Sequence, residues 1–138
     1  MKRLIGLVIL VGCTIMSAKA QLEKIPDLKP GNSAEEKKRV SRESINVRDS
    51  LNTFLAAVTN KNEKERADPV RRRRLNLVLD ELRINKAQID KVVEEVAATP
   101  DDAWNTTVQD KISRTIRDVR QNVKKIREDV KDLILINS

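Results

Sequence analysis

Apolar residues recur at every third or fourth position along the second half of the chain, between Trp104 and Leu133. They are Trp104, Val108, Ile112, Ile116, Val119, Val123, Ile126, Val130 and Leu133. At about 100° per residue these positions form a helical stripe roughly 120° wide, and nearly every residue off the stripe is polar. The segment Thr99–Asp102 offers a capping threonine, a proline for the first helical position and two aspartates for the positive end of the helix dipole. The pattern predicts one helix of about 37 residues over 100–136.

Two further amphipathic segments precede this helix. The first runs from Ala34 to about Asn60 and begins with a capping box, Ser33 followed three residues later by Glu36. Its apolar positions are Val40, Val47, Leu51, Phe54, Leu55 and Val58. The second begins at Asp68-Pro69, a capping residue followed by a proline at the first helical position. Its apolar positions are Leu75, Val78, Leu79, Leu82, Ile89, Val92, Val93 and Val96.

Two features of the second segment bear on its path. Asn85 lies in the middle of the apolar pattern and indicates either a kink or the start of a shorter fourth helix. Ala97, Ala98 and Thr99 lead directly into the third helix, and so short a connection makes the two helices antiparallel neighbours.

These patterns predict an all-α fold. The expected architecture is an elongated three-helix antiparallel bundle over residues 34–138. The alternative is a coiled-coil-like helical hairpin that another subunit completes. Charged residues make up 36% of the 138 residues and aromatic residues only 1%, a composition that suits long helices packed side by side.

The N-terminal segment 1–20 has the three parts of a secretory signal peptide. A positive start, Met1-Lys2-Arg3, precedes an apolar run over 4–16, and Ala18-Lys19-Ala20 then supplies a cleavage pattern. We expect cleavage after Ala20, a flexible tether over 21–33 and export of the chain to the periplasm or the medium.

Cys13 allows a competing interpretation. The segment Leu10-Val11-Gly12-Cys13 resembles a bacterial lipobox, in which the cysteine receives a lipid and becomes the N-terminus of an envelope lipoprotein. The apolar run continues past Cys13 to Met16, which favours cleavage after Ala20 instead. That cleavage removes the only cysteine, so the core alone would hold the exported domain together.

The composition argues against catalysis. The chain has no histidine and one cysteine, which removes the usual metal ligands and most pairings of a nucleophile with a base. Adjacent acidic residues such as Glu94 and Glu95 point apart on a helix and make a poor acid–base pair. We therefore expect no enzymatic activity, no cofactor, no metal and no small-molecule substrate.

Positive charge concentrates between the first two helices. Residues 61–74 contain seven basic and three acidic residues, and Arg71, Arg72, Arg73 and Arg74 are consecutive. The run opposes the helix dipole and spans about 300° of the helix surface. It is either a solvated cluster or a contact for an anionic surface such as a membrane. Nucleic acid is an unlikely partner, because the chain is expected to be exported and no aromatic residue lies beside the arginines.

Leu133, Ile134, Leu135 and Ile136 form the other unusual run. Four consecutive apolar residues surround a helix, so some of them must lie off the core stripe. The run is either a covered end of the bundle or a surface for docking and oligomerisation. Taken together, the sequence predicts an exported, non-enzymatic helical protein that acts through self-association or a protein partner of unknown identity.

Overall fold

The computed structural model describes the backbone of residues 30–135 and the side chains of residues 33–134. The chain divides into two compact units, Met1–Asn32 and Ser33–Ser138, and the fold described below is that of the second. The predicted signal peptide over 1–20, with Cys13, lies outside the described residues, and so does Ile136.

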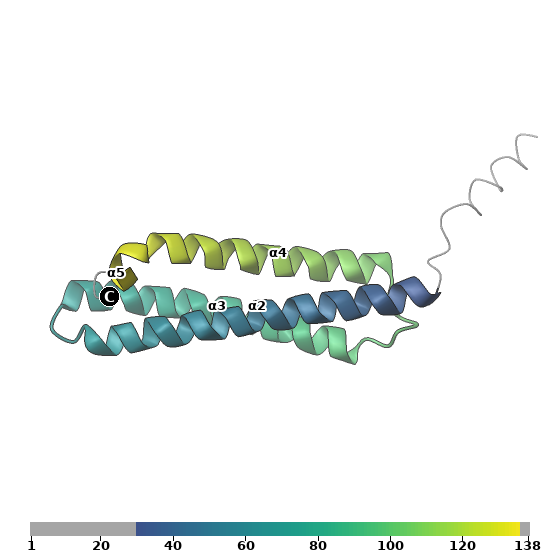
Figure 1. Cartoon of the computed structure of the whole chain (residues 1–138), viewed down its shortest axis with the longest axis horizontal. Coiled ribbons are helices and arrows are strands. Elements are labelled where there is room, and N and C mark those ends of the chain that lie inside the picture. Colours follow the sequence, from purple (N-terminus) through teal and green to yellow (C-terminus); the bar gives the residue numbers. More distant parts are fainter. Residues whose placement is uncertain (1–29, 136–138) are drawn as a thin grey trace, which may run out of the picture. The chain divides into compact units, whose positions relative to one another are not determined.

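Residues 30–135 form four helices: α2 (Pro30–Lys64), α3 (Pro69–Ala98), α4 (Thr106–Asp129) and α5 (Lys131–Leu135). Residues 30–135 contain no strand. The three long helices lie side by side, and α3 runs opposite to α2 and α4 (Figure 1). The prediction of an all-helical fold with three long helices is thereby confirmed.

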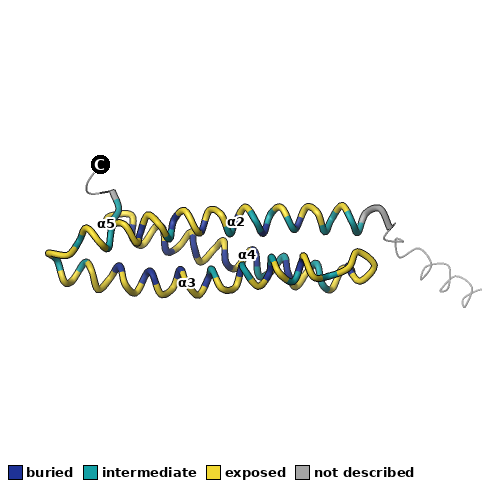
Figure 2. Tube along the Cα trace, turned by 90° about the horizontal axis from the view of Figure 1, so that it is seen from below, coloured by how far each residue is buried: buried dark blue, intermediate teal, exposed yellow. Residues whose placement is uncertain are grey.

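The core follows the apolar stripes. On α2 the buried positions are Val40, Ser44, Val47, Leu51, Phe54 and Val58, and on α4 they include Ile112, Ile116, Val119, Val123 and Ile126. Spacings of four and three residues alternate along both helices, which is the repeat that keeps one face of a helix toward its neighbours in a coiled-coil-like packing. The buried positions accordingly turn inward, while the outer faces are exposed (Figure 2).

The start of α3 matches its sequence signal. The Asp68 carboxylate accepts hydrogen bonds from the backbone N–H groups of Val70 and Arg71, and Pro69 occupies the first turn, where its missing N–H costs nothing. The helix then continues without interruption to Ala98, so Asn85 does not start a separate helix.

The sequence predicted that the third long helix begins at Pro100, but the helix begins at Thr106. Thr99 ends α3 instead, because its N–H and its hydroxyl both bond to the carbonyl of Glu95. Pro100 disfavours helical geometry at the residue before it, which stops α3 there. Asn105 caps α4 by accepting a hydrogen bond from the N–H of Val108. The connection between the two helices is therefore a seven-residue loop over 99–105.

Trp104 accounts for the length of this loop. Its side chain is only 4% exposed and packs into the core from the loop, although the sequence pattern had placed it on the helix. The burial of so large an apolar group stabilises the non-helical path of the chain.

The third long helix also ends earlier than predicted. α4 ends at Asp129, Val130 has non-helical geometry, and the chain turns into the short helix α5. The turn still buries Val130 and Leu133. The guanidinium of Arg74 donates to the Asp129 carbonyl and pairs with Asp132 at 3.1 Å, so it satisfies a carbonyl at the break.

The first helix begins before its predicted capping box. α2 starts at Pro30, so Ser33 lies inside the helix and the last four residues of the predicted tether are helical. Proline at the first helical position has a backbone angle already suited to the helix, which accounts for this earlier start.

Candidate functional site

The arginine run lies in the first turns of α3, and its four members have different surroundings. Arg71 is half-buried and lies near two carboxylates, at 3.4 Å from Asp68 and 3.8 Å from Glu65. Arg74 is held by α4 and α5 through Asp129 and Asp132. The guanidinium groups of Arg72 and Arg73 are exposed and have no ion-pair partner within the described chain. Only half of the run is therefore available to an external anion.

The apolar run at the C-terminal end divides in a similar way. Leu133 is buried in the core, and Ile134 is half-buried and packs against the core. The side chain of Leu135 and the whole of Ile136 lie outside the described residues. The described half of this run contributes to the bundle, and only Ile134 offers some surface.

A third surface emerges from the structure that the sequence patterns did not single out. Val70, Leu77 and Ile84 of α3 are 79%, 62% and 61% exposed, and they are the exposed large apolar side chains of the described chain. They are seven residues apart, so on a helix successive members differ by about 20° and Val70 and Ile84 by about 40°. We call these three residues the α3 stripe. The signal was present in the sequence as apolar residues that repeat off the core face.

Charged residues flank the α3 stripe, with the basic residues before Leu77 and the acidic residues after it. Arg73 and Arg74 lie between Val70 and Leu77, and Asp80 and Glu81 lie between Leu77 and Ile84. All four side chains are exposed. Asp80 pairs with Arg83 at 3.0 Å, whereas the carboxylate of Glu81 has no ion-pair partner among the described residues. The stripe therefore has a basic half toward the start of α3 and an acidic half after it.

A shallow groove adjoins the acidic half of the stripe. It has a volume of about 280 Å³ and lies between α3 and α4, with Glu81, Ile84 and Asn85 on one side and Asn122 and Lys125 on the other. Asn85 is only 6% exposed, and its amide donates to the Glu81 carbonyl at 2.9 Å while its Oδ1 has no partner within residues 33–134. An apolar side chain that enters this groove would contact Ile84 at its rim.

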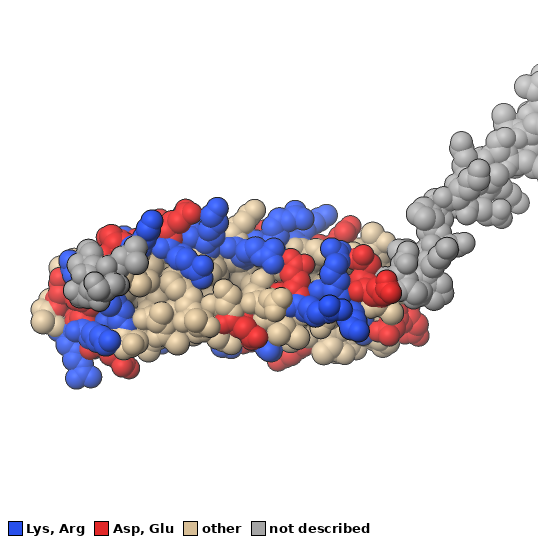
Figure 3. Space-filling model, in the orientation of Figure 1, with Lys and Arg blue, Asp and Glu red and all other residues tan. Residues whose placement is uncertain are grey.

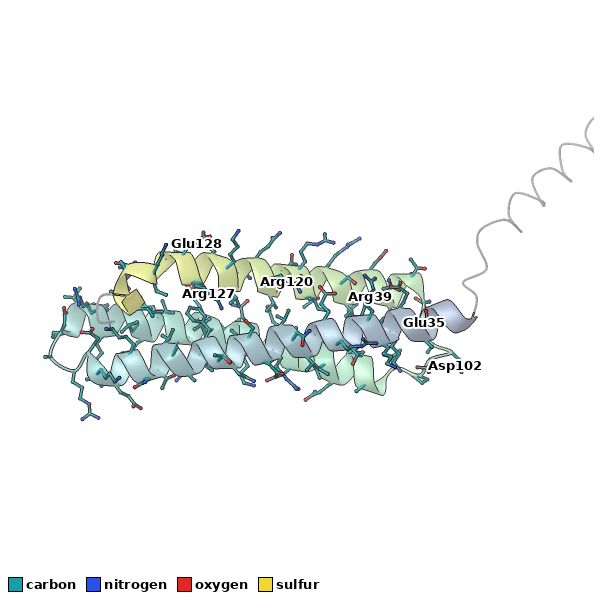
Figure 4. All side chains as sticks on the ribbon, viewed as in Figure 1. Glu35, Arg39, Asp102, Arg120, Arg127 and Glu128 are labelled. Carbon is teal, nitrogen blue, oxygen red and sulfur yellow. The ribbon has the colours of Figure 1, made fainter. Side chains whose placement is uncertain are left out.

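A second, more apolar groove lies between α2 and the end of α4. Phe54, Ala57 and Ile134 line it together with Arg127, and its volume is about 470 Å³. The Arg127 guanidinium lies 5.0 Å from the Phe54 ring centroid, and Figure 4 shows Arg127 directed from α4 toward α2. The guanidinium thus covers part of the ring of Phe54, a residue that is only 7% exposed. In the view of Figure 1, Figure 3 shows an uncharged tan area with charged side chains around it.

Ion pairs link segments that are far apart in the sequence. They join α4 to α2 through Arg120 and Glu43 at 3.0 Å, α4 to α3 through Lys111 and Glu95 at 2.7 Å, and α2 to the loop through Lys37 and Asp101 at 2.7 Å. Exposed pairs of this kind each contribute little to stability. Within the described residues, no cluster of potential metal ligands occurs and no helix has the length and apolar character needed to cross a membrane.

Comparisons with protein-family models, with characterised proteins and with solved structures find no match to this chain. The chemistry of the described surface is therefore the basis on which a function can be argued. The α3 stripe is the part of that surface whose composition departs most from a solvated helix.

Proposed function

We propose that this chain is an exported, non-enzymatic helical protein that works through protein–protein interaction, and that the α3 stripe is its contact surface. The observation that carries this proposal is the exposure of Val70, Leu77 and Ile84 at a spacing of seven residues. Three large apolar side chains aligned on one helix form a seam of the kind that another helix covers. Single exposed apolar residues are ordinary, but an aligned series on one helix is not.

Site-specific photo-crosslinking in the source cells tests the contact. A photoreactive amino acid at Leu77 is expected to give a crosslinked species heavier than the 15.7 kDa chain, whose composition mass spectrometry then identifies. The same amino acid at Lys124, an exposed residue of α4, is the matched control and is expected to give none. Absence of a crosslink from Leu77, or equal crosslinking from Lys124, would reject the stripe as the contact surface.

Export is a separate part of the proposal and rests on the anatomy of residues 1–20. Mass spectrometry of the N-terminus of the native protein distinguishes its alternatives. A chain that begins at Gln21 supports secretion or periplasmic release, whereas a lipidated Cys13 supports anchoring in the envelope. An intact Met1 in the native protein would overturn export by a cleaved signal peptide.

A further inference from the structure

We infer that the partner of the α3 stripe is a second copy of this chain, bound with its α3 antiparallel around a two-fold axis at Leu77. This inference rests on the proposed function and names its partner. Three observations carry it: the symmetry of the apolar positions, the order of the flanking charges and the groove beside Ile84.

The apolar positions are symmetric about Leu77. Val70 precedes it by seven residues and Ile84 follows it by seven. When a second α3 lies antiparallel on the first, Leu77 meets its own copy and each Val70 meets an Ile84 of the other chain. A two-fold interface requires this kind of self-complementarity, because the same patch serves both subunits.

The flanking charges agree with the same axis. At about 100° per residue, Arg73 and Asp80 lie on one flank of the stripe, and Arg74 and Glu81 lie on the other. The two-fold axis makes the second α3 run in the opposite direction. The flank with Arg73 and Asp80 then faces its own copy, and so does the flank with Arg74 and Glu81. Arg73 therefore comes opposite Asp80, and Arg74 comes opposite Glu81. A parallel arrangement in the same register would place arginine against arginine and acid against acid.

Each proposed pair has one group without an intrachain ion pair. The guanidinium of Arg73 and the carboxylate of Glu81 are exposed and have no ion-pair partner in the described chain, whereas their counterparts Asp80 and Arg74 already pair with Arg83 and Asp132 and would share those contacts with the second copy. The groove of about 280 Å³ beside Ile84 lies where Val70 of the second copy would pack. Three apolar side chains from each copy make a small interface, and we expect a reversible dimer with a dissociation constant on the order of 100 μM.

The test uses residues 21–138, which include the whole unit Ser33–Ser138 and every described core residue. Sedimentation equilibrium up to about 1 mM is expected to show a monomer–dimer equilibrium that weakens as salt is added. Arg73→Glu and Asp80→Lys are each expected to weaken the dimer about tenfold. The double variant, in which the two charges are exchanged, is expected to regain affinity to within about threefold of the original. Arg74 stays unchanged because it bonds to Asp129 and Asp132.

A matched control changes charge elsewhere. Arg117→Glu on the exposed face of α4 alters net charge as Arg73→Glu does, and it is expected to leave the dimer unchanged. The far-UV circular dichroism spectrum of each variant verifies that the bundle still folds. A chain that stays monomeric at 1 mM overturns the inference, and so does a dimer that neither charge reversal affects.

Cysteine crosslinking tests the direction of the pairing, because residues 21–138 contain no cysteine. Leu77→Cys is expected to form a disulfide with its own copy under mild oxidation. Val70→Cys and Ile84→Cys are expected to crosslink to each other when mixed, and neither to itself. Self-crosslinking of Val70→Cys would show a parallel pair and overturn the axis.

Two outcomes separate this inference from the proposed function. If photo-crosslinking from Leu77 captures a different protein while the purified chain stays monomeric, the contact surface stands and self-association fails. If the chain is monomeric and Arg73→Glu instead removes its binding to vesicles of phosphatidylglycerol, the arginines contact a membrane and the inference also fails. A crosslinked species composed only of this chain supports both the stripe as the contact surface and the second copy as its partner.

Discussion

At the residue scale, Asn85 is the most unusual side chain of the core. It is buried in the middle of α3 beside the groove that Asn122 and Lys125 also line, and only its amide N–H group has a described partner, the carbonyl of Glu81. A buried carbonyl oxygen without a hydrogen bond costs on the order of 1–3 kcal/mol. Polar residues at such positions fix the register of packed helices at the expense of stability.

Replacement of this asparagine should therefore stabilise the protein. We expect Asn85→Leu to raise the free energy of unfolding by about 1 kcal/mol, because it removes an unpaired polar atom and adds apolar contact. Urea denaturation followed by the fluorescence of Trp104, the sole tryptophan, measures this change. Asn52→Leu, at an exposed position of α2, is the control and should change it by less than about 0.5 kcal/mol. A loss of stability in Asn85→Leu would show that its oxygen has a partner.

At the element scale, the ends of the helices depend on individual side chains. Asp68 and Asn105 cap α3 and α4 through the backbone N–H groups of their first turns. Arg74 acts at the opposite end of α4, where it bonds to the Asp129 carbonyl and pairs with Asp132 of α5. One arginine of the basic run thus contacts both the end of α4 and α5.

This role makes Arg74 distinguishable from its neighbours. Arg74→Gln should increase amide hydrogen exchange over residues 127–135 and lower stability by about 1 kcal/mol, because the carbonyl of Asp129 and the carboxylate of Asp132 lose a charged donor. Arg72→Gln removes the same charge from an exposed position without an ion pair, and it should leave exchange in that segment unchanged. Equal exchange in both variants would mean that Arg74 does not hold α5.

At the scale of the whole molecule, one core joins the three long helices. Ile116 of α4 is 1% exposed and belongs to the same cluster as Leu51 of α2 and Leu82 of α3. A single shared core makes unfolding cooperative, so a defect in the stripe of one helix should affect all three.

An unpaired charge in that core should be severe. We expect Ile116→Asp to lower the free energy of unfolding by more than about 3 kcal/mol, or to prevent folding at 37 °C. Lys124→Ala, on the exposed face of the same helix, should change it by well under about 1 kcal/mol. Thermal melting monitored by circular dichroism compares the two, and similar melting temperatures would contradict the assignment of the buried face of α4.

The sequence alone determined which faces of the helices are buried. The sequence predicted the stripes from Val40 to Val58 and from Ile112 to Ile126. Apolar residues at spacings of three and four lie on one side of a helix, so they can all be buried only if that side faces the core. The sequence also predicted the start of α3 at Asp68-Pro69, because a capping side chain bonds to backbone N–H groups only two or three residues further along the chain. The availability of Leu135, Ile136 and Cys13 for contact or lipidation stays a prediction.

The tertiary structure decided where the third long helix begins and ends and which apolar residues remain outside the core. Thr99 and Asn105 are both good caps, and the burial of Trp104 selected the loop between them. The break after Asp129 depends on Arg74, which is far away in sequence. Val70, Leu77 and Ile84 repeat off the core face in the sequence, but the repeat does not say whether another helix covers them. Only the placement of α2 and α4 against the other side of α3 leaves these three exposed, because burial depends on neighbours that no local pattern contains.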